Sequence, residues 1–238
     1  MGKQVIKRET LHRLGFSSSY PLICATIKLY LGQNGSRVDM PTTTDTTSGS
    51  RQKLVEATIE LMSSRGFEAM GINSILEAAG VSKSNFYYHF KSKEDLCLAA
   101  LETMIDMFFQ QMLEPILSNK SLSPRKRLEK FLKGMADMIE YECCNKGCPF
   151  VNLATETSDF LPAFRERISH YFDQYQQRLA DIIQEGIKLG EFRSDISAKA
   201  AAQVLLASMN GTIVLAKVHK RPQVMKDNIK SFLALLAP

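Results

Sequence analysis

The sequence has 238 residues, of which 45% are hydrophobic and 23% are charged. This composition excludes a fibrous or a largely disordered chain and is typical of soluble globular proteins. The formal net charge of +5 is too small to indicate nucleic-acid binding by itself. The five cysteines are an odd number, so a disulfide framework is not expected. The cysteine use points to a reducing compartment, so we expect a cytoplasmic protein. No uninterrupted apolar run reaches the ~20 residues that cross a bilayer.

The first 48 residues differ in composition from everything that follows. Residues 41–50 form a Thr, Ser and Gly run around Asp45, which can bury almost no apolar surface and is predicted to be disordered. The composition changes abruptly at Met40. We therefore interpret residues 1–48 as a disordered extension, or as one that contains a translated leader upstream of a natural start at Met40.

From Ser50 onward, apolar residues recur at helical spacing, and strand-like alternation is nowhere sustained. A first helix is marked by Leu54, Thr58, Leu61 and Met62 and ends at Gly66. Ser92 begins a long fourth helix with a start that resembles a capping box. Other helices are predicted at 72–79, 83–89, 124–143, 150–157, 163–189, 197–219 and 223–236. The fold class is all-α with about nine helices, divided into a small helical module over 49–96 and a second domain over 97–238.

Residues 72–90 have the spacing of a helix-turn-helix, in which one helix braces a second helix in the major groove of DNA. Gly80 can adopt the positive φ angle that the turn needs. Val81 and Phe86 are placed to fix the second helix against the first, and Ser82 is placed to cap its N-terminus. From Ser82 to Lys93 the chain is basic and contains no acid, which suits contact with phosphates.

One continuous string of the sequence reads Ala79-Gly80-Val81-Ser82-Lys83-Ser84-Asn85-Phe86-Tyr87-Tyr88-His89-Phe90-Lys91-Ser92-Lys93-Glu94-Asp95-Leu96. This string resembles the signature of the tetracycline-repressor (TetR) family. One departure is Leu76, where the family usually has Ala, and it puts the docking geometry in doubt. The resemblance implies phosphate contacts from Tyr87, His89 and Lys93. It implies contacts with bases or backbone from Lys83, Ser84, Asn85 and Tyr88, while Phe90 is expected in the core.

Family resemblance is thinner beyond Leu101. Gly190-Glu191-Phe192-x-x-Asp195 looks like the turn between the two long late helices of these repressors, and Ala200, Ala201 and Gly211 stand where the family keeps small residues. The resemblance implies a homodimer formed by the last two helices. Such a dimer presents two recognition helices about one DNA turn (~34 Å) apart and binds a palindromic operator.

A second motif reads Gly147-Cys148-Pro149-Phe150-Val151-Asn152-Leu153-Ala154-x-Glu156. It resembles the Gly-Cys loop of a TetR subgroup that includes electrophile-responsive repressors, such as the N-ethylmaleimide-responsive repressor. A helix N-terminus and Lys146 beside Cys148 would both favour its thiolate. Lys217 is a candidate to approach the loop, and Cys143 and Cys144 are candidate resolving thiols. A structural role, a thiol sensor and, more remotely, a metal ligand all remain open for Cys148.

A reversible small-molecule effector is the alternative to an electrophile. Its pocket is expected among the fourth to eighth helices, although Met and aromatic residues at helical spacing also suit a plain core. The candidate residues that line this effector pocket are Met104, Phe108, Met135, Met138, Ile139, Phe150, Phe172 and Tyr175.

Two rival functions are a DNA-binding protein without an effector and a thiol enzyme. No phosphate-binding loop or metal-binding motif supports an enzyme, and no cofactor is expected.

Overall fold

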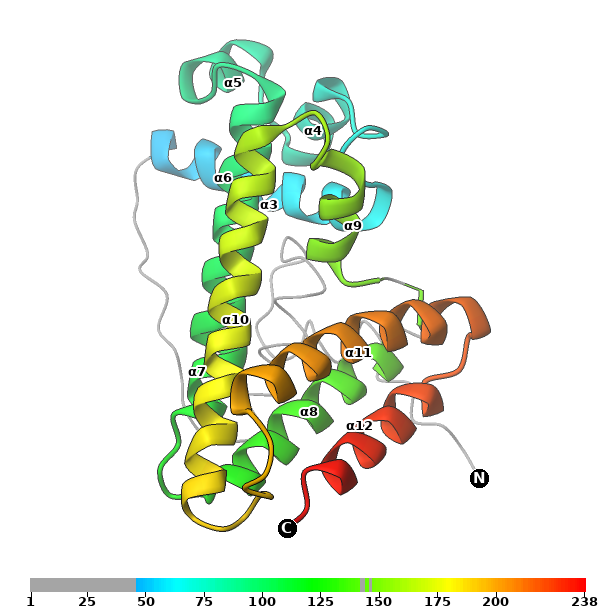
Figure 1. Ribbon diagram of the computed structural model, residues 1–238. Helices are drawn as coiled ribbons and strands as arrows, with labels where there is room; N and C mark the ends of the chain where they lie inside the picture. The colour runs from blue at the N-terminus through cyan, green and yellow to red at the C-terminus, as the bar shows by residue number, and fades with distance from the viewer. Residues whose placement is uncertain (1–45, 142–143, 146) are drawn as a thin grey trace, which may run out of the picture. The chain divides into compact units, whose positions relative to one another are not determined.

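The computed structural model describes residues 46–141, 144–145 and 147–238, which form no strand and nine helices, the continuous stretch Lys93–Leu117 being counted as one (Figure 1). Residues 1–45, which include Met40, lie outside the described residues, as do Cys143 and Lys146. The sequence-based interpretations of these residues therefore stay predictions. The described chain divides into two compact units. The first contains residues 46–62 and 70–101, and the second contains residues 63–69 and 102–238.

The first unit consists of most of α3 (Thr46–Arg65), α4 (Ile72–Ala79), α5 (Lys83–His89) and the beginning of α6 (Lys93–Met107). Its core contains fully buried side chains from each helix: Leu54, Ile75, Phe86 and Leu96. The prediction of disorder over residues 41–50 is wrong for residues 46–50, which belong to α3. Ser50 accepts a hydrogen bond from the side chain of Asn85 in α5, and this contact ties the second turn of α3 to α5.

Helix α6 begins as the sequence predicts. The backbone N–H of Asp95 donates to Ser92 Oγ at 3.1 Å, and Asp95 Oδ2 accepts from the backbone N–H of Lys91 at 3.0 Å. The helix continues through a π-helical segment, η1 (Phe108–Leu113), into α7 (Glu114–Leu117). A π-helical segment widens the helix by inserting a residue, and such segments are often found at functional sites.

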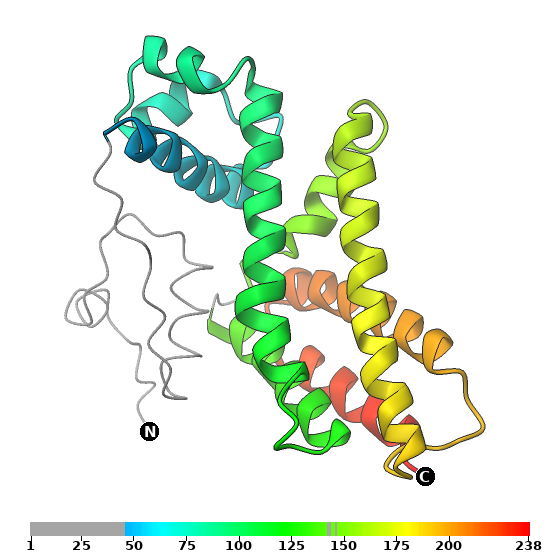
Figure 2. The same cartoon turned by 90° about the vertical axis from the view of Figure 1, so that its left-hand side faces the viewer.

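The second unit contains five further helices. Helix α10 is a single long rod that packs against α8, α9 and α11, and α12 packs against α8 and α11 (Figures 1 and 2). Their bounds agree with the predicted ones to within two residues wherever the chain is described. These helices are α8 (Pro124–Tyr141), α9 (Pro149–Thr157), α10 (Pro162–Lys188), α11 (Ala198–His219) and α12 (Gln223–Leu235).

Two stretches, Lys93–Leu117 and Ala198–His219, are long and apolar enough to span a membrane by length and composition alone. The expectation based on uninterrupted apolar runs did not identify them, because scattered polar residues interrupt both stretches. In the structure each stretch has one face in the protein core, with Leu96 and Leu113 on the first and Leu205 and Ile213 on the second. Core helices of folded proteins commonly have this length and composition.

The turn after α10 depends on two glycines. Gly190 has a φ of +71°, and a Cβ added to Gly186 would overlap the ring of Phe192. Phe192 is buried, so its ring closes the end of α10 only because residue 186 has no side chain. Glu191 in the same turn accepts a hydrogen bond from the backbone N–H of Arg125 at 2.8 Å, which satisfies a free donor at the start of α8.

A buried cation joins α7, α8 and α10. The guanidinium of Arg127 is 2% exposed and donates to the carbonyl of Leu117 at 2.7 Å and to Glu185 Oε1 at 2.6 Å. Lys120 Nζ lies 2.8 Å from the other oxygen of Glu185. The hydrogen bonds from Arg127 and then Lys120 lower the pKa of Glu185 below its ordinary value of 4.5.

This lowered pKa predicts an acid-sensitive contribution to stability. A carboxyl group with a depressed pKa in the folded state stabilises the fold above its unfolded-state pKa, and this contribution is lost as the pH falls through the folded-state pKa. Replacing Glu185 by Gln should lower the free energy of unfolding by about 1–2 kcal/mol at pH 7. Urea unfolding of both proteins should show this gap shrinking toward pH 3, and a gap that is the same at both pH values would contradict the assignment.

Candidate nucleic-acid interface and effector site

The turn between α4 and α5 has the geometry that the sequence predicts. Gly80 has φ +61° and ψ +36°, and its N–H donates to the carbonyl of Glu77 at 3.2 Å. The N–H of Val81 donates to the carbonyl of Leu76 at 3.1 Å, which completes the end of α4. Val81 and Phe86 are both buried, as predicted for the residues that fix α5 against α4.

Ser82 caps α5. Its hydroxyl accepts a hydrogen bond from the backbone N–H of Asn85 at 3.3 Å and lies 3.1 Å from the hydroxyl of Ser84. The cap confirms the predicted start of the helix. The other free N–H groups of the first turn, together with Lys83, leave this end of α5 suited to a phosphate oxygen.

The polar face of α5 is open. Lys83 and Ser84 are exposed, and the side chains of Tyr87 and Tyr88 are 53% and 74% exposed. Two exposed tyrosines on a seven-residue helix are unusual for a core element, because they bury little of their apolar surface. Phe90 is buried, as expected, and the guanidinium of Arg51 lies 5.2 Å from the centre of its ring.

Three of the predicted DNA-binding residues have a different environment. Asn85 is partly buried, and its side-chain amide donates to Ser50 Oγ at 3.0 Å, so this amide braces α5 against α3. The Nε2 atom of His89 is buried without a hydrogen-bond partner among the described residues, so a phosphate contact through this atom requires the ring to turn. Lys93 is partly exposed in the first turn of α6.

The second unit contains a cluster of buried aromatic rings. The rings of Phe150 in α9 and Tyr171 in α10 are stacked with their centres 3.9 Å apart. Phe108, from the π-helical segment, lies edge-to-face against Tyr171 at 5.3 Å and against Tyr175 at 4.9 Å. The structure therefore brings together Phe108, Phe150 and Tyr175 from the predicted effector set.

The hydroxyl of Tyr175 is the unsatisfied group of this cluster. The side chain is 4% exposed, and its hydroxyl has no hydrogen-bond partner among the described residues. Burial raises the pKa of Tyr175, with a smaller contribution from the nearby Cys148. A buried hydroxyl without a partner costs about 1–3 kcal/mol, so this group is an energetically unfavourable feature of the cluster.

The remaining predicted effector residues have varied environments. Met104, Met135 and Ile139 are buried, and Met138 is partly buried. Phe172 is partly buried and its ring centre lies 5.0 Å from that of Tyr171. The predicted set did not include Tyr171, although it contacts more of the aromatic rings than any residue that was included.

Cys148 lies at the N-cap of α9, where the sequence places it, but its electrostatics differ from the prediction. Burial of the thiol raises its pKa. The backbone N–H groups of Val151 and Phe150 lower the pKa by a smaller amount. At this N-cap, desolvation therefore opposes the helix-terminus effect expected from the sequence, and Lys146, the second premise of that expectation, lies outside the described residues.

Lys220, which was not among the residues predicted from the sequence, contacts the residues just before the Gly-Cys loop, and the approach of Lys217 to the loop stays a prediction. Lys220 Nζ donates to the Cys144 carbonyl at 3.4 Å and to Asn145 Oδ1 at 3.1 Å, whereas Lys217 is exposed. Cys144 is buried and has a φ of +55°. Across the described parts of the chain, no group of three His, Cys, Asp or Glu side chains is placed to hold a metal ion.

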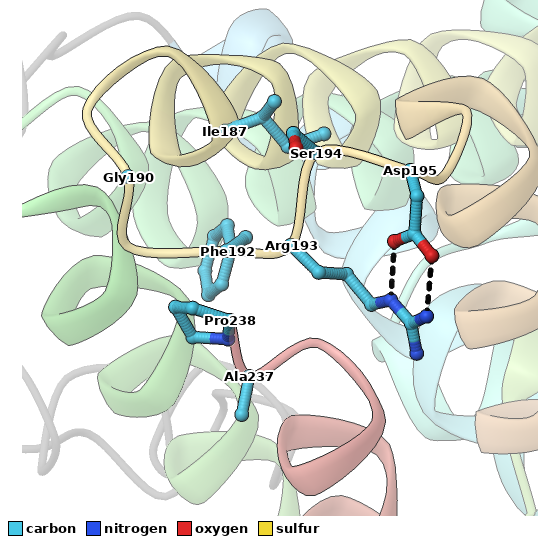
Figure 3. A pocket seen from close by; sticks show the side chains of 8 residues that line it. All are labelled: Ile187, Gly190, Phe192, Arg193, Ser194, Asp195, Ala237 and Pro238. Carbon is cyan, nitrogen blue, oxygen red and sulfur yellow. Dashed lines mark hydrogen bonds and ion pairs between the residues drawn. The ribbon is translucent and has the colours of Figure 1, made fainter.

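A separate depression of about 550 Å³ lies between the turn after α10 and the last residues of the chain (Figure 3). Arg193 donates two hydrogen bonds of 2.6 Å to Asp195 at its rim. Phe192 and Pro238 lie beside one another within it. None of the eight predicted effector residues lines this depression, so it does not correspond to the predicted site.

Two models of one protein family match the chain. Residues 54–100 match the model described as "Bacterial regulatory proteins, tetR family". Residues 124–232 match the model described as "Tetracyclin repressor-like, C-terminal domain". The first match covers the helix-turn-helix, and the second covers most of the second unit.

Relatives and solved structures extend this similarity over most of the chain. The transcriptional regulator AcuR of Cereibacter sphaeroides is 28% identical over 77% of this chain and 83% of its own length. The repressor DhaR of Mycobacterium sp. (strain GP1) is 26% identical over 79% of this chain and 92% of its own. A crystal structure of the regulatory protein TetR from Rhodobacter sphaeroides has 28% identity and a TM-score of 0.73, covering 79% of this chain and 99% of that one. Escherichia coli NemR, at 23% identity and a TM-score of 0.71 over 79% of this chain and 97% of its own, shows the same fold.

The contact between Ser50 and Asn85 predicts an energetic coupling within the first unit. We expect a double-mutant cycle of Ser50→Ala and Asn85→Ala, followed by thermal unfolding, to give a coupling of about 0.5–1.5 kcal/mol, which is the net contribution of one such hydrogen bond. The cycle cancels the gain in helix propensity that Ser50→Ala brings alone. Strictly additive effects would show that Asn85 does not brace α5.

Proposed function

Because the chain belongs to the TetR family of transcriptional regulators, we propose that it is a sequence-specific repressor that binds a palindromic operator as a homodimer and is released by an effector. The observation that supports this most directly is α5, a capped helix of seven residues with two exposed tyrosines and an exposed lysine on its outer face. The domains divide the work, with residues 49–96 binding DNA and residues 97–238 binding the effector and the second subunit. A DNA-binding protein of this kind acts in the cytoplasm and needs no catalytic site.

The residues of the DNA interface take two roles. Ser82 and the first turn of α5, together with Tyr87, His89 and Lys93, bind phosphates and set the register on the duplex. Lys83, Ser84 and Tyr88 face the base edges, where a lysine suits the acceptors of guanine. Asn85 reads adenine only if its amide leaves Ser50, so its contribution to sequence preference competes with its bracing role.

The dimer is supported by an exposed apolar surface on α11. Val204, Val214, Leu215 and Val218 of this helix are between 48% and 69% exposed. Such a face is costly in water and is covered in a two-fold dimer, where each subunit contributes the same surface. Leu235 of α12 is 66% exposed and belongs to the same proposed interface. A Cβ added at Gly211 would meet no atom beyond its own helix within 4 Å, so this open position allows close approach of the partner helix.

The effector site is supported by the aromatic cluster. The rings of Phe108, Phe150 and Tyr171 offer apolar surface, and the Tyr175 hydroxyl offers one unsatisfied polar group. A small, mostly apolar molecule with one hydrogen-bonding group fits this chemistry. An electrophile that reacts with Cys148 is the second form of the same proposal, since Cys148 lies close enough to influence the pKa of both Tyr171 and Tyr175.

Binding-site selection from genomic DNA fragments with the purified protein tests the repressor proposal. We expect enrichment of a palindrome whose half-sites lie about 10 bp apart. On that site, Lys93→Ala should weaken binding similarly for all sequences and reduce the salt slope by about one, whereas Lys83→Ala should also change the preferred bases. Enrichment without any shared sequence would instead support an architectural DNA-binding protein.

A second measurement separates the two forms of effector. Treatment with N-ethylmaleimide should release the wild-type protein from the selected operator, and Cys148→Ser should prevent the release. Because burial raises the pKa of this thiol, we expect the reaction to be slow at pH 7 and to accelerate as the pH rises. Cys144→Ser is the matched control and should respond as the wild type does. Equal release of Cys148→Ser and wild type would contradict a sensor role for Cys148.

A further inference from the structure

We propose that Glu156 is the positioning residue through which α9 controls the helices of the DNA-binding unit, an inference that rests on the proposed function for its biological meaning. Glu156 ends the Gly-Cys motif of the sequence, and neither the DNA interface nor the effector site uses it. Its carboxylate is partly buried on the last turn of α9.

Both oxygens of this carboxylate bind backbone N–H groups of one distant loop. Oε2 accepts from the N–H of Phe67 at 2.9 Å, and Oε1 accepts from the N–H of Glu68 at 2.7 Å. Hydrogen bonds to a charged acceptor are stronger than neutral ones, and two parallel bonds also fix the direction of approach. Glu156 therefore holds two consecutive peptide groups in one orientation.

The loop is shaped to receive this carboxylate. Gly66 has a φ of +84°, and a Cβ at this position would lie 2.7 Å from Glu156 Oε2. Any other residue at position 66 would therefore push the carboxylate away as well as strain the backbone. The ring of Phe67 is buried edge-to-face against Phe164 of α10 at 5.5 Å, which fixes the loop at a second point.

The position of this loop in the chain gives the contact its consequence. Residues 63–69 belong to the second unit, although residues 46–62 and 70–101 on either side belong to the first. Helix α3 ends at Arg65, and α4 begins at Ile72. A displacement of the loop therefore acts through covalent bonds on the end of α3 and on the start of α4, the helix that braces the recognition helix.

The opposite end of α9 lies in the aromatic cluster. Phe150 stacks on Tyr171 at 3.9 Å, and six residues later the same helix presents Glu156. At 1.5 Å of rise per residue, these two positions are about 9 Å apart along the axis. A helix of two and a half turns moves as one body over this distance, so a molecule that displaces Phe150 also displaces the carboxylate that holds the loop.

Hydrogen exchange measured by mass spectrometry tests this coupling without DNA or an effector. Phe150→Leu removes the ring stack at one end of α9. In the otherwise wild-type chain, this substitution should accelerate exchange across residues 66–79 by a factor on the order of three or more. Glu156→Gln alone should accelerate exchange at Phe67 and Glu68 by about tenfold, because a neutral amide oxygen replaces a charged acceptor.

The double variant decides between coupling and simple structural support. If Glu156 transmits the change, Phe150→Leu should have no further effect on residues 66–79 in a chain that already carries Glu156→Gln. Gly66→Ala, which disturbs the same contact from the loop side, should abolish the effect in the same way. Glu166→Gln on the exposed face of α10 is the matched control and should leave the Phe150→Leu effect intact.

An effect of Phe150→Leu on residues 66–79 that is equal in the wild-type chain and in the Glu156→Gln variant would overturn the proposal. Unchanged exchange at Phe67 and Glu68 in Glu156→Gln would overturn it too. Failure to select an operator would count against the proposed function and would leave these exchange results standing, so the two failures are distinguishable.

Discussion

The proposed DNA interface depends on the burial of one side chain, Phe86. A helix of seven residues is not stable alone in water, so α5 exists only where tertiary contacts hold it. Phe86 is fully buried, and its position fixes which residues of α5 face outward. The left-handed turn at Gly80 and the Ser82 cap then determine where the helix begins. The exposure of Lys83, Tyr87 and Tyr88 follows from these constraints.

The thiol of Cys148 shows which of two opposed effects is larger. A helix N-terminus stabilises a nearby negative charge by about 0.3–1 kcal/mol, which corresponds to less than one pKa unit. Burial can raise a pKa by several units, and at Cys148 burial prevails. Cys148 is itself partly exposed, so an electrophile that reaches it meets a thiol whose raised pKa favours the protonated, less reactive form.

Local patterns predicted the helices and the turn, because caps, glycines and apolar spacing act within a few residues. Gly80, Ser82 and the Ser92 start of α6 are of this kind. The same patterns could not predict that Asn85 binds Ser50 or that Lys220 reaches Asn145, because these partners are 35 and 75 residues apart. The N-terminal boundary differs as well: the composition of residues 46–50 predicts disorder, whereas these residues belong to α3, and Ser50 among them pairs with the distant Asn85. Tyr171 was missed because an aromatic residue on an amphipathic face gives no sign of which rings it meets.

The chemistry at position 156 explains why an acid is suited to it. Two consecutive N–H groups point at the same place, and a carboxylate offers each of them its own charged oxygen. An amide would present one oxygen and one additional donor, leaving an N–H of the loop opposed by another N–H. The buried face of α9 is occupied by Phe150, Leu153 and Thr157, so its rotation about the axis is fixed by packing. A change that reorients this face must therefore either break the two bonds of Glu156 or move the loop with them, and both outcomes alter the connection from α3 to α4.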